Sequence, residues 1–356
     1  MIALFTALTA ALFAALLVNQ YSVRRAPYQL AWAVGAAAFA TAAGAEALAA
    51  SFGWSEPLYR VWYLTGAVWT AGWLGTGTVV LLSKTRFGYW YAACLALAGL
   101  FTILVARRLE DATAGPIALL YALLAWGAAA SVAWLAYLGS PRWSRIAVGL
   151  VVLLSAVALP LVATAVLPAP GWATDPQTGA PVAQLVPPTL RLLTPLLNIS
   201  GAFALLTGAL FSAYVFMPKV RALPYSSDPR QRGDELLFNL AIAPFAIAVN
   251  FVTSLPLAFA AWRSGTLNRR VPATLLIALG AFVPSLTDTL TRAGSTEAYQ
   301  LGKAVGALVL LIGFLTSVDD PDEITLPLLG APLRAALRDR KSTRLNSSHE
   351  WISRMP

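Results

Sequence analysis

The stretch IALFTALTAALFAALLVNQY, residues 2–21, contains no charged side chain and is closely followed by Arg24 and Arg25. Its length matches the roughly 20 predominantly apolar residues that a transmembrane helix needs. No basic residue precedes it, whereas a cleavable signal peptide carries positive charge before its apolar region. Basic residues beside a membrane helix favour the inner side of the membrane. The stretch therefore predicts a retained membrane helix with its N-terminus outside.

The composition of the whole chain extends this prediction to a multi-pass membrane protein. Of its 356 residues, 58% are apolar and 12% are charged, whereas soluble domains have about 45–50% and 25%. At about 20 residues per crossing, this apolar content suffices for about ten membrane segments. Ten apolar runs follow one another: 2–21, 28–50, 58–82, 89–106, 116–138, 146–167, 196–217, 236–262, 272–290 and 299–318. We expect an all-α, polytopic integral membrane helical bundle.

Basic residues between the first seven runs follow the positive-inside rule with one mild exception. Arg107 and Arg108 fall on the expected outer side, where Glu110 and Asp111 follow them. The Pro-rich connection 168–195 suits an exposed external loop. We therefore expect residues 1–217 to form a seven-span bundle with its N-terminus outside, and residues 218–318 to contribute three further membrane segments.

The run 236–262 has two interpretations, because Pro244, Asn250 and Pro256 interrupt it. One kinked crossing would place the following basic residues outside: Arg263, Arg269 and Arg270. A broken re-entrant segment would keep them inside. Length favours the crossing, whereas charge favours re-entry. We prefer the crossing, since early helices dominate orientation, and keep nine spans plus a re-entrant segment as the alternative.

The end of the chain differs in composition from the rest. Residues 319–338 are expected to form a short surface tail, on a side of the membrane left open, with a short amphipathic helix over 326–338. Residues 339–356, DRKSTRLNSSHEWISRMP, resemble translated sequencing-adapter sequence. A genuine disordered basic tail is the alternative.

Cysteine and histidine are nearly absent, which argues against disulfides, most metal sites and catalytic sites that use these residues. Cys94 lies in an apolar run and His349 lies in the suspect tail. An internal disulfide and a thiolate metal cluster need more cysteines than one. Histidine-ligated haem, zinc or iron and triads that use histidine are disfavoured as well. We expect no catalytic residue, no cofactor and no metal site.

The net charge and the amino-acid composition predict where in the cell the protein resides. Arginine outnumbers lysine 21 to 4, and alanine, glycine and leucine are abundant, which indicates a GC-rich bacterial genome. The net charge of +9 lies mostly in short loops, where it signals orientation rather than nucleic-acid binding. We expect a bacterial inner (plasma) membrane protein whose partners are the lipid bilayer and either another helix or a small solute, with no nucleic acid.

Charged side chains within membrane helices cost roughly 2.5–3.5 kcal/mol each, so each needs a partner or a purpose. Glu46 and Arg60 flank the turn near Trp54 at similar depths, which predicts an ion pair across a helix hairpin. Arg60 can instead extend to the interface, and Glu46 can line an outward polar pocket. Asp288 and Lys303 repeat the arrangement in the last two runs, as a helix clamp or an ion- or proton-coupled site.

Uncharged residues supply weaker signals. Asn198 and Asn250 are candidates for interhelical hydrogen bonds or, at the Pro-broken run, for a cation or substrate site. The spacing of Ala67, Ala71 and Gly75 permits close helix contact. Aromatic residues near the span ends predict an interfacial belt rather than a ligand cage: Trp54, Tyr59, Trp62, Tyr63, Tyr89, Trp90, Tyr91 and Trp143.

Three classes of function remain. The preferred one is a non-enzymatic membrane sensor or scaffold core. The alternative is a secondary transporter or permease for a small solute that uses the broken run 236–262 with Asp288 and Lys303. An intramembrane enzyme ranks last, because no phosphate-binding loop, pair of catalytic carboxylates or metal-ligand cluster is present in the sequence.

Overall fold

The computed structural model describes residues 1–317 except 110, 177–178, 227–232 and 293–297. The side chains of residues 233–237, 240, 285–292 and 298 also lie outside the description. Most of the described chain is helical, and no strand occurs in it beyond one isolated bridge between Thr174 and Pro181. Eight of these helices are long and apolar enough to cross a membrane. The predicted all-α membrane bundle is confirmed.

The helices follow the apolar runs and end where charged residues, glycine or proline interrupt them. In chain order they are α1 (Ile2–Arg24), α2 (Pro27–Phe52), α3 (Glu56–Trp62), η1 (Tyr63–Trp69), α4 (Thr70–Leu81), α5 (Phe87–Ala106), α6 (Ala114–Tyr137), α7 (Trp143–Thr164), η2 (Ala183–Leu185), α8 (Pro188–Phe216), α9 (Gly233–Arg263), α10 (Arg270–Arg292) and α11 (Ala298–Ser317). Gly53 ends α2 with a φ of 84°, a conformation that glycine adopts without strain.

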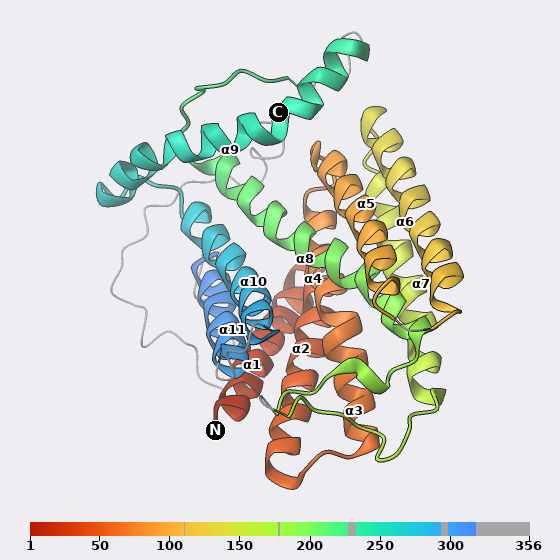
Figure 1. Cartoon of the computed structure of the whole chain (residues 1–356). Coiled ribbons are helices and arrows are strands. Elements are labelled where there is room, and N and C mark those ends of the chain that lie inside the picture. Colours follow the sequence, from red (N-terminus) through yellow and green to blue (C-terminus); the bar gives the residue numbers. More distant parts are fainter. Residues whose placement is uncertain (110, 177–178, 227–232, 293–297, 318–356) are drawn as a thin grey trace.

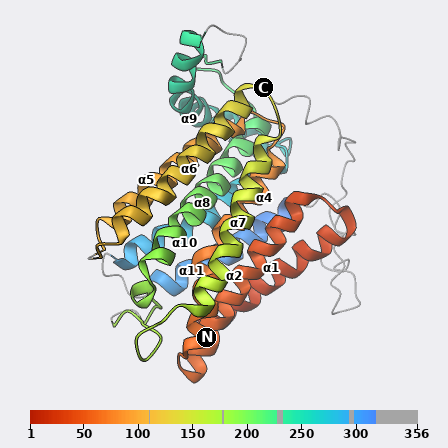
Figure 2. The ribbon, with the colours of Figure 1, turned by 90° about the vertical axis from the view of Figure 1, so that its right-hand side faces the viewer.

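The long helices run up and down between two ends of one bundle, with α1 and α2 inclined to α5–α8 (Figures 1 and 2). We call the end at which the chain starts the N-terminal end. The α2–α3 turn lies there too, as do residues 165–176 and 179–187, which we call the loop 165–187. We call the opposite end the basic end. It contains the segments that join α1 to α2, α4 to α5 and α6 to α7, and the described segment 217–226 that follows α8.

The third crossing of the bundle consists of three helical pieces in succession. Residues 63–69 between α3 and α4 form a π-helix, and the Thr70 hydroxyl donates a 2.8 Å hydrogen bond to the Thr65 carbonyl. A π-helical turn inside an α-helix is rare and occurs often at functional sites. In this fold the π-helical piece lies in the half of the bundle nearer the N-terminal end.

Glycines allow α4 and α8 to cross in direct backbone contact. A Cβ atom on Gly75 would lie 2.3 Å from the Gly201 carbonyl oxygen, and a Cβ on Gly201 would lie 2.2 Å from the Ala71 carbonyl oxygen. The close helix contact predicted from Ala71 and Gly75 is therefore confirmed. Small residues allow such approach in membrane helices, where packing replaces the hydrophobic effect as the driving force.

The α10–α11 pair packs against the earlier helices rather than standing apart from them. Helix α10 lies against α11 and α8, and α11 lies against α1. Phe13 of α1 meets Phe314 of α11 edge to face, with ring centroids 5.7 Å apart. The last two helices therefore complete the wall of the bundle beside α1 and α2.

Helix α9 lies across the basic end of the bundle instead of traversing it (Figures 1 and 2). Tyr214 and Met217 at the end of α8 pack with Ala258 near the end of α9 and with Val271 at the start of α10. A crossing would separate these groups by about 30 Å, the thickness of the hydrocarbon core. Although its composition would permit a crossing, the preferred expectation for 236–262 is corrected.

This placement removes the conflict between chain length and charge. Arg263 and Arg270 flank the connection from α9 to α10, and Arg270 lies over the ring of Phe216, 5.0 Å from its centroid. They therefore stay at the basic end, as the positive-inside rule requires. In the described part of the chain, the helices that run between the two ends of the bundle are α1, α2, the α3–η1–α4 unit, α5, α6, α7, α8, α10 and α11 (Figures 1 and 2).

Helix α8 begins earlier than expected, inside the segment taken as an external loop. Pro188 occupies its first turn and Pro195 lies within it. Proline is favoured at the first helical position, where its missing N–H costs nothing. The connection between α7 and α8 is therefore shorter than the predicted loop 168–195, and Arg191 belongs to a helix.

Several aromatic residues that were assigned to an interfacial belt are core residues. Four of them are each at most 2% exposed: Tyr59, Tyr63, Tyr91 and Trp143. They pack in the main hydrophobic cluster, which is built from helices α2 to α8. The assignment to a belt is wrong for these four, because end-of-run position in sequence does not reveal which way a side chain points.

Candidate functional site

The Glu46 carboxylate is buried inside the bundle, near the N-terminal end of it. It lies on α2, six residues before Phe52 ends that helix, which is about 9 Å along the helix axis. The side chain is 6% exposed. Such a group needs full compensation by hydrogen bonds and opposite charge.

Helices α3 and α11 supply that compensation. The Trp62 indole N–H donates to Glu46 Oε1 over 2.9 Å, and the Gln300 amide donates to Oε2 over 3.2 Å. The Tyr299 hydroxyl donates to Oε1 over 3.4 Å. Lys303 forms an ion pair with Oε2, and its ammonium lies 3.9 Å from the centroid of the Tyr299 ring. Side chains of α3, the next helix after α2, and of the distant α11 thus converge on one carboxylate.

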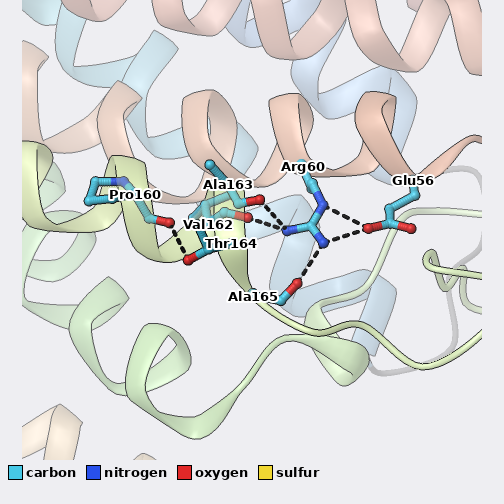
Figure 3. A network of polar contacts seen from close by, with 7 residues as sticks. All are labelled: Glu56, Arg60, Pro160, Val162, Ala163, Thr164 and Ala165. Atoms are coloured by element: carbon cyan, nitrogen blue, oxygen red, sulfur yellow. Dashed lines mark hydrogen bonds and ion pairs between the residues drawn. The ribbon is translucent and has the colours of Figure 1, made fainter.

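The predicted pairing of Glu46 with Arg60 is wrong, since each has other partners. Arg60 forms an ion pair with Glu56, one turn earlier on α3. Its guanidinium also donates to the backbone carbonyls of Val162 and Ala163, the latter over 3.3 Å, and to that of Ala165 (Figure 3). The last carbonyls of a helix have no partner within it. Arg60 therefore caps the C-terminal end of α7.

The other predicted residues are distributed over the fold. Asp288 belongs to α10, but its side chain lies outside the described residues, so its proposed pairing with Lys303 stays a prediction. Asn250 is 1% exposed and hydrogen-bonds the backbone of Leu223 at the basic end. Among the candidates whose side chains the structure describes, Asn198 joins Glu46 and Lys303 at one place, a cavity.

This cavity has a volume of about 620 Å³ and lies at the N-terminal end. Its wall combines α2, the π-helical piece η1, α8, α10, α11 and the loop 165–187. Its polar lining includes Glu46, Asp175, Arg191, Thr194, Asn198 and Lys303. A volume of 300–1,000 Å³ with a few convergent polar groups is typical of small-molecule sites.

Hydrogen bonds tie the elements beside the cavity to one another. The Tyr59 hydroxyl donates to the Val182 carbonyl in the loop 165–187. One turn further along the chain, the Tyr63 hydroxyl and the Thr194 hydroxyl lie 2.9 Å apart. The loop and the start of α8 are therefore tied to the helical unit that contains η1.

The Asn198 amide has an unusual position. Its Oδ1 atom is buried and has no hydrogen-bond partner among the described residues, and the residue lines the cavity. Unsatisfied buried acceptors are rare and destabilising in native proteins. A donor from a bound molecule or a water would satisfy this one.

Sequence reasoning missed Tyr299, Gln300 and Arg191 as parts of this site. A signal was available for Tyr299, because residues four apart on a helix share a face and Lys303 follows it at that spacing. No such signal existed for Arg191, which lay in a segment predicted to be a loop. In the described part of the chain, no group of three or more His, Cys, Asp or Glu side chains is arranged to hold a metal ion.

Comparison of the chain with protein-family models, with curated protein sequences and with solved structures finds no match.

Proposed function

We propose that this membrane protein binds a small polar solute in the cavity beside Glu46 and Lys303, in a non-enzymatic role as the core of a sensor. The observation that carries the proposal is the ion pair of the buried Glu46 carboxylate, which accepts four hydrogen bonds, with the partly buried Lys303 in the wall of a cavity of about 620 Å³. Intramembrane ionisable residues mark functional sites by default.

Energetics support a role beyond stability. Replacing a buried ion pair by apolar residues of similar volume is often neutral or stabilising, whereas removing one partner costs about 3–5 kcal/mol. A clamp between α2 and α11 can be made from leucine alone. Packing of α2 against α11 therefore does not require the ion pair, and recognition of a polar solute would explain its presence.

The charges of the cavity point to a class of solute. Its described lining contains two acids, Glu46 and Asp175, and two bases, Arg191 and Lys303. The balanced charges favour a neutral polar or zwitterionic solute over a simple ion. The orphaned acceptor of Asn198 favours a solute with an N–H or O–H donor.

The basic residues support an orientation in which this cavity faces outward. The connections at the opposite end contain most of the described arginine and lysine residues, among them Lys84, Arg142, Lys219 and Arg269. By the positive-inside rule that end is cytoplasmic, so the solute would enter from outside, with the N-terminus on the same side.

Transport is the second candidate, and one observation favours it. The cavity is lined partly by the π-helical piece η1 and by Pro284 of α10, and irregular helices line the sites of many transporters. The broken run 236–262 does not contribute to this cavity, so the transport hypothesis now depends on Lys303 with Glu46. Uptake into proteoliposomes would distinguish transport from sensing.

Binding is tested with purified protein in lipid nanodiscs, by the shift in unfolding temperature with glycine, acetamide, choline or acetate. We expect glycine or acetamide to stabilise the wild type more than choline or acetate, and Glu46→Gln to abolish the effect. Glu56→Gln is the matched control, because Glu56 lies at the same end and pairs outside the cavity with Arg60. Equal shifts in both variants would contradict the proposal.

A further inference from the structure

A second cavity, also of about 620 Å³, lies at the basic end between α5, α8, α9 and the segment that follows α8. Three cationic side chains line it: Arg86, Lys219 and Arg221. Its described lining contains no carboxylate. The positive charge that orients the chain is therefore concentrated around a hollow and not spread over a flat surface.

Helix α9 positions two of these cations. The Ser254 hydroxyl accepts a 2.9 Å hydrogen bond from the Val220 N–H. Asn250 hydrogen-bonds both the N–H and the carbonyl of Leu223, each over 2.8 Å. Ser254 and Asn250 are at most 1% exposed. These contacts fix the backbone on both sides of Arg221, which explains why an apolar helix places polar residues on its buried face.

Aromatic residues complete the wall. The Lys219 ammonium lies 5.2 Å from the centroid of the Tyr214 ring. Burial raises the pKa of Tyr225 to about 12, so its hydroxyl stays protonated at physiological pH and adds no negative charge to the cavity. Partial burial and the nearby Arg221 lower the pKa of Lys219. An anion between these two cations would relieve their repulsion.

The surroundings favour an anion that comes with a lipid. Along α9, Phe245, Val252 and Phe259 are 60–66% exposed and recur every seven residues, which places them on one face. A helix with such a face lies at the boundary between headgroups and acyl chains. The cavity therefore opens beside lipid, at the level where basic pockets between membrane helices hold phosphate-bearing headgroups.

We propose that this cavity binds the phosphate group of an anionic phospholipid of the inner leaflet, with Lys219 and Arg221 as its cationic ligands. The site is separate from the outer cavity, and its test does not depend on solute binding there.

The test compares binding of phosphatidylglycerol to the full chain in nanodiscs of phosphatidylcholine with and without that lipid, detected by native mass spectrometry. The variant K219Q/R221Q removes two charges from the cavity. The control R142Q/R145Q removes two charges from exposed positions at the same end. At roughly tenfold per charge-assisted hydrogen bond to the phosphate, we expect K219Q/R221Q to bind about 100-fold more weakly. The control pair lies outside the cavity and should bind nearly as the wild type.

Equal weakening in the two variants would overturn the proposal, because diffuse surface charge would then explain binding. Competition by inorganic phosphate distinguishes the two sources of the same chemistry. If inorganic phosphate displaces the lipid only at concentrations far above that of the lipid, the result supports a lipid site. Phosphate that binds equally well without any anionic lipid would overturn the assignment to a phospholipid.

Discussion

Glu46 of α2 and Lys303 of α11 form an ion pair inside the bundle although 257 positions separate them in sequence. The pair joins the second membrane helix to the last one described, and the cavity lies beside it. Its chemistry is the centre of the proposed function, and its energetics can be measured directly.

Replacing either partner by methionine should destabilise the fold by about 3–5 kcal/mol, because the remaining charge stays buried without a counter-charge. The double variant Glu46→Met with Lys303→Met should lose less than the sum of the two, with a coupling energy of about 1–3 kcal/mol. Denaturant titration of the four proteins in detergent measures this cycle. Additive effects would show that the two side chains do not interact.

Arg60→Gln should destabilise α7 without affecting the cavity, since Arg60 satisfies carbonyls at the end of that helix. We expect a loss of about 1–3 kcal/mol and faster hydrogen exchange around residues 160–167. Glu56→Gln removes only the partly exposed ion pair, which is worth about 0–1 kcal/mol. Exchange that stays at the wild-type rate in Arg60→Gln would show that the cap is dispensable.

Gly75→Ala should disrupt the crossing of α4 and α8, because the added Cβ would lie 2.3 Å from the Gly201 carbonyl oxygen. Overpacking of this kind costs about 1–3 kcal/mol. Gly44→Ala is the control, as its Cβ would have no neighbour within 4 Å, and it should leave stability unchanged or raise it. Thermal unfolding followed by size-exclusion chromatography compares the two. Equal stability of the two variants would show that α4 and α8 do not cross in close contact at Gly75.

The position of α9 predicts the side on which Ser264 lies. In a Cys94→Ala background, Ser264→Cys should react with a membrane-impermeant thiol reagent from the same side as Ser22→Cys. Ser51→Cys, at the N-terminal end, should react from the other side. Labelling of Ser264→Cys and Ser51→Cys from one common side would restore a crossing by α9.

Most of the fold could be predicted from the sequence, because length and apolar content decide which segments can cross a membrane. The position of α9 could not, since its apolar content suits both a crossing and a surface location. In the structure, α9 is held at the basic end by contacts between residues far apart in sequence, such as that of Asn250 with Leu223. The local sequence pattern does not indicate such contacts.

For the candidate site, the sequence likewise indicates the individual residues but not how they pair. Glu46 and Lys303 could each be identified as a charge that the bilayer penalises. Their mutual pairing could not be predicted, because it depends on α11 packing beside α2 and not on either hairpin turn. The sequence pattern pairs Arg60 with Glu46 across the α2–α3 turn. In the structure, Arg60 instead pairs with Glu56 on its own helix and with carbonyls at the end of α7.

The central claim is that water and small solutes reach the outer cavity from the side of the N-terminus. Accessibility of Ala67, which lines the cavity, tests it most directly. In a Cys94→Ala background, Ala67→Cys should react with a charged methanethiosulfonate reagent applied on the side from which Ser51→Cys is labelled. Ala98→Cys, fully buried in the core, should stay unreactive. Failure of Ala67→Cys to react, or reaction only from the opposite side, would contradict the account.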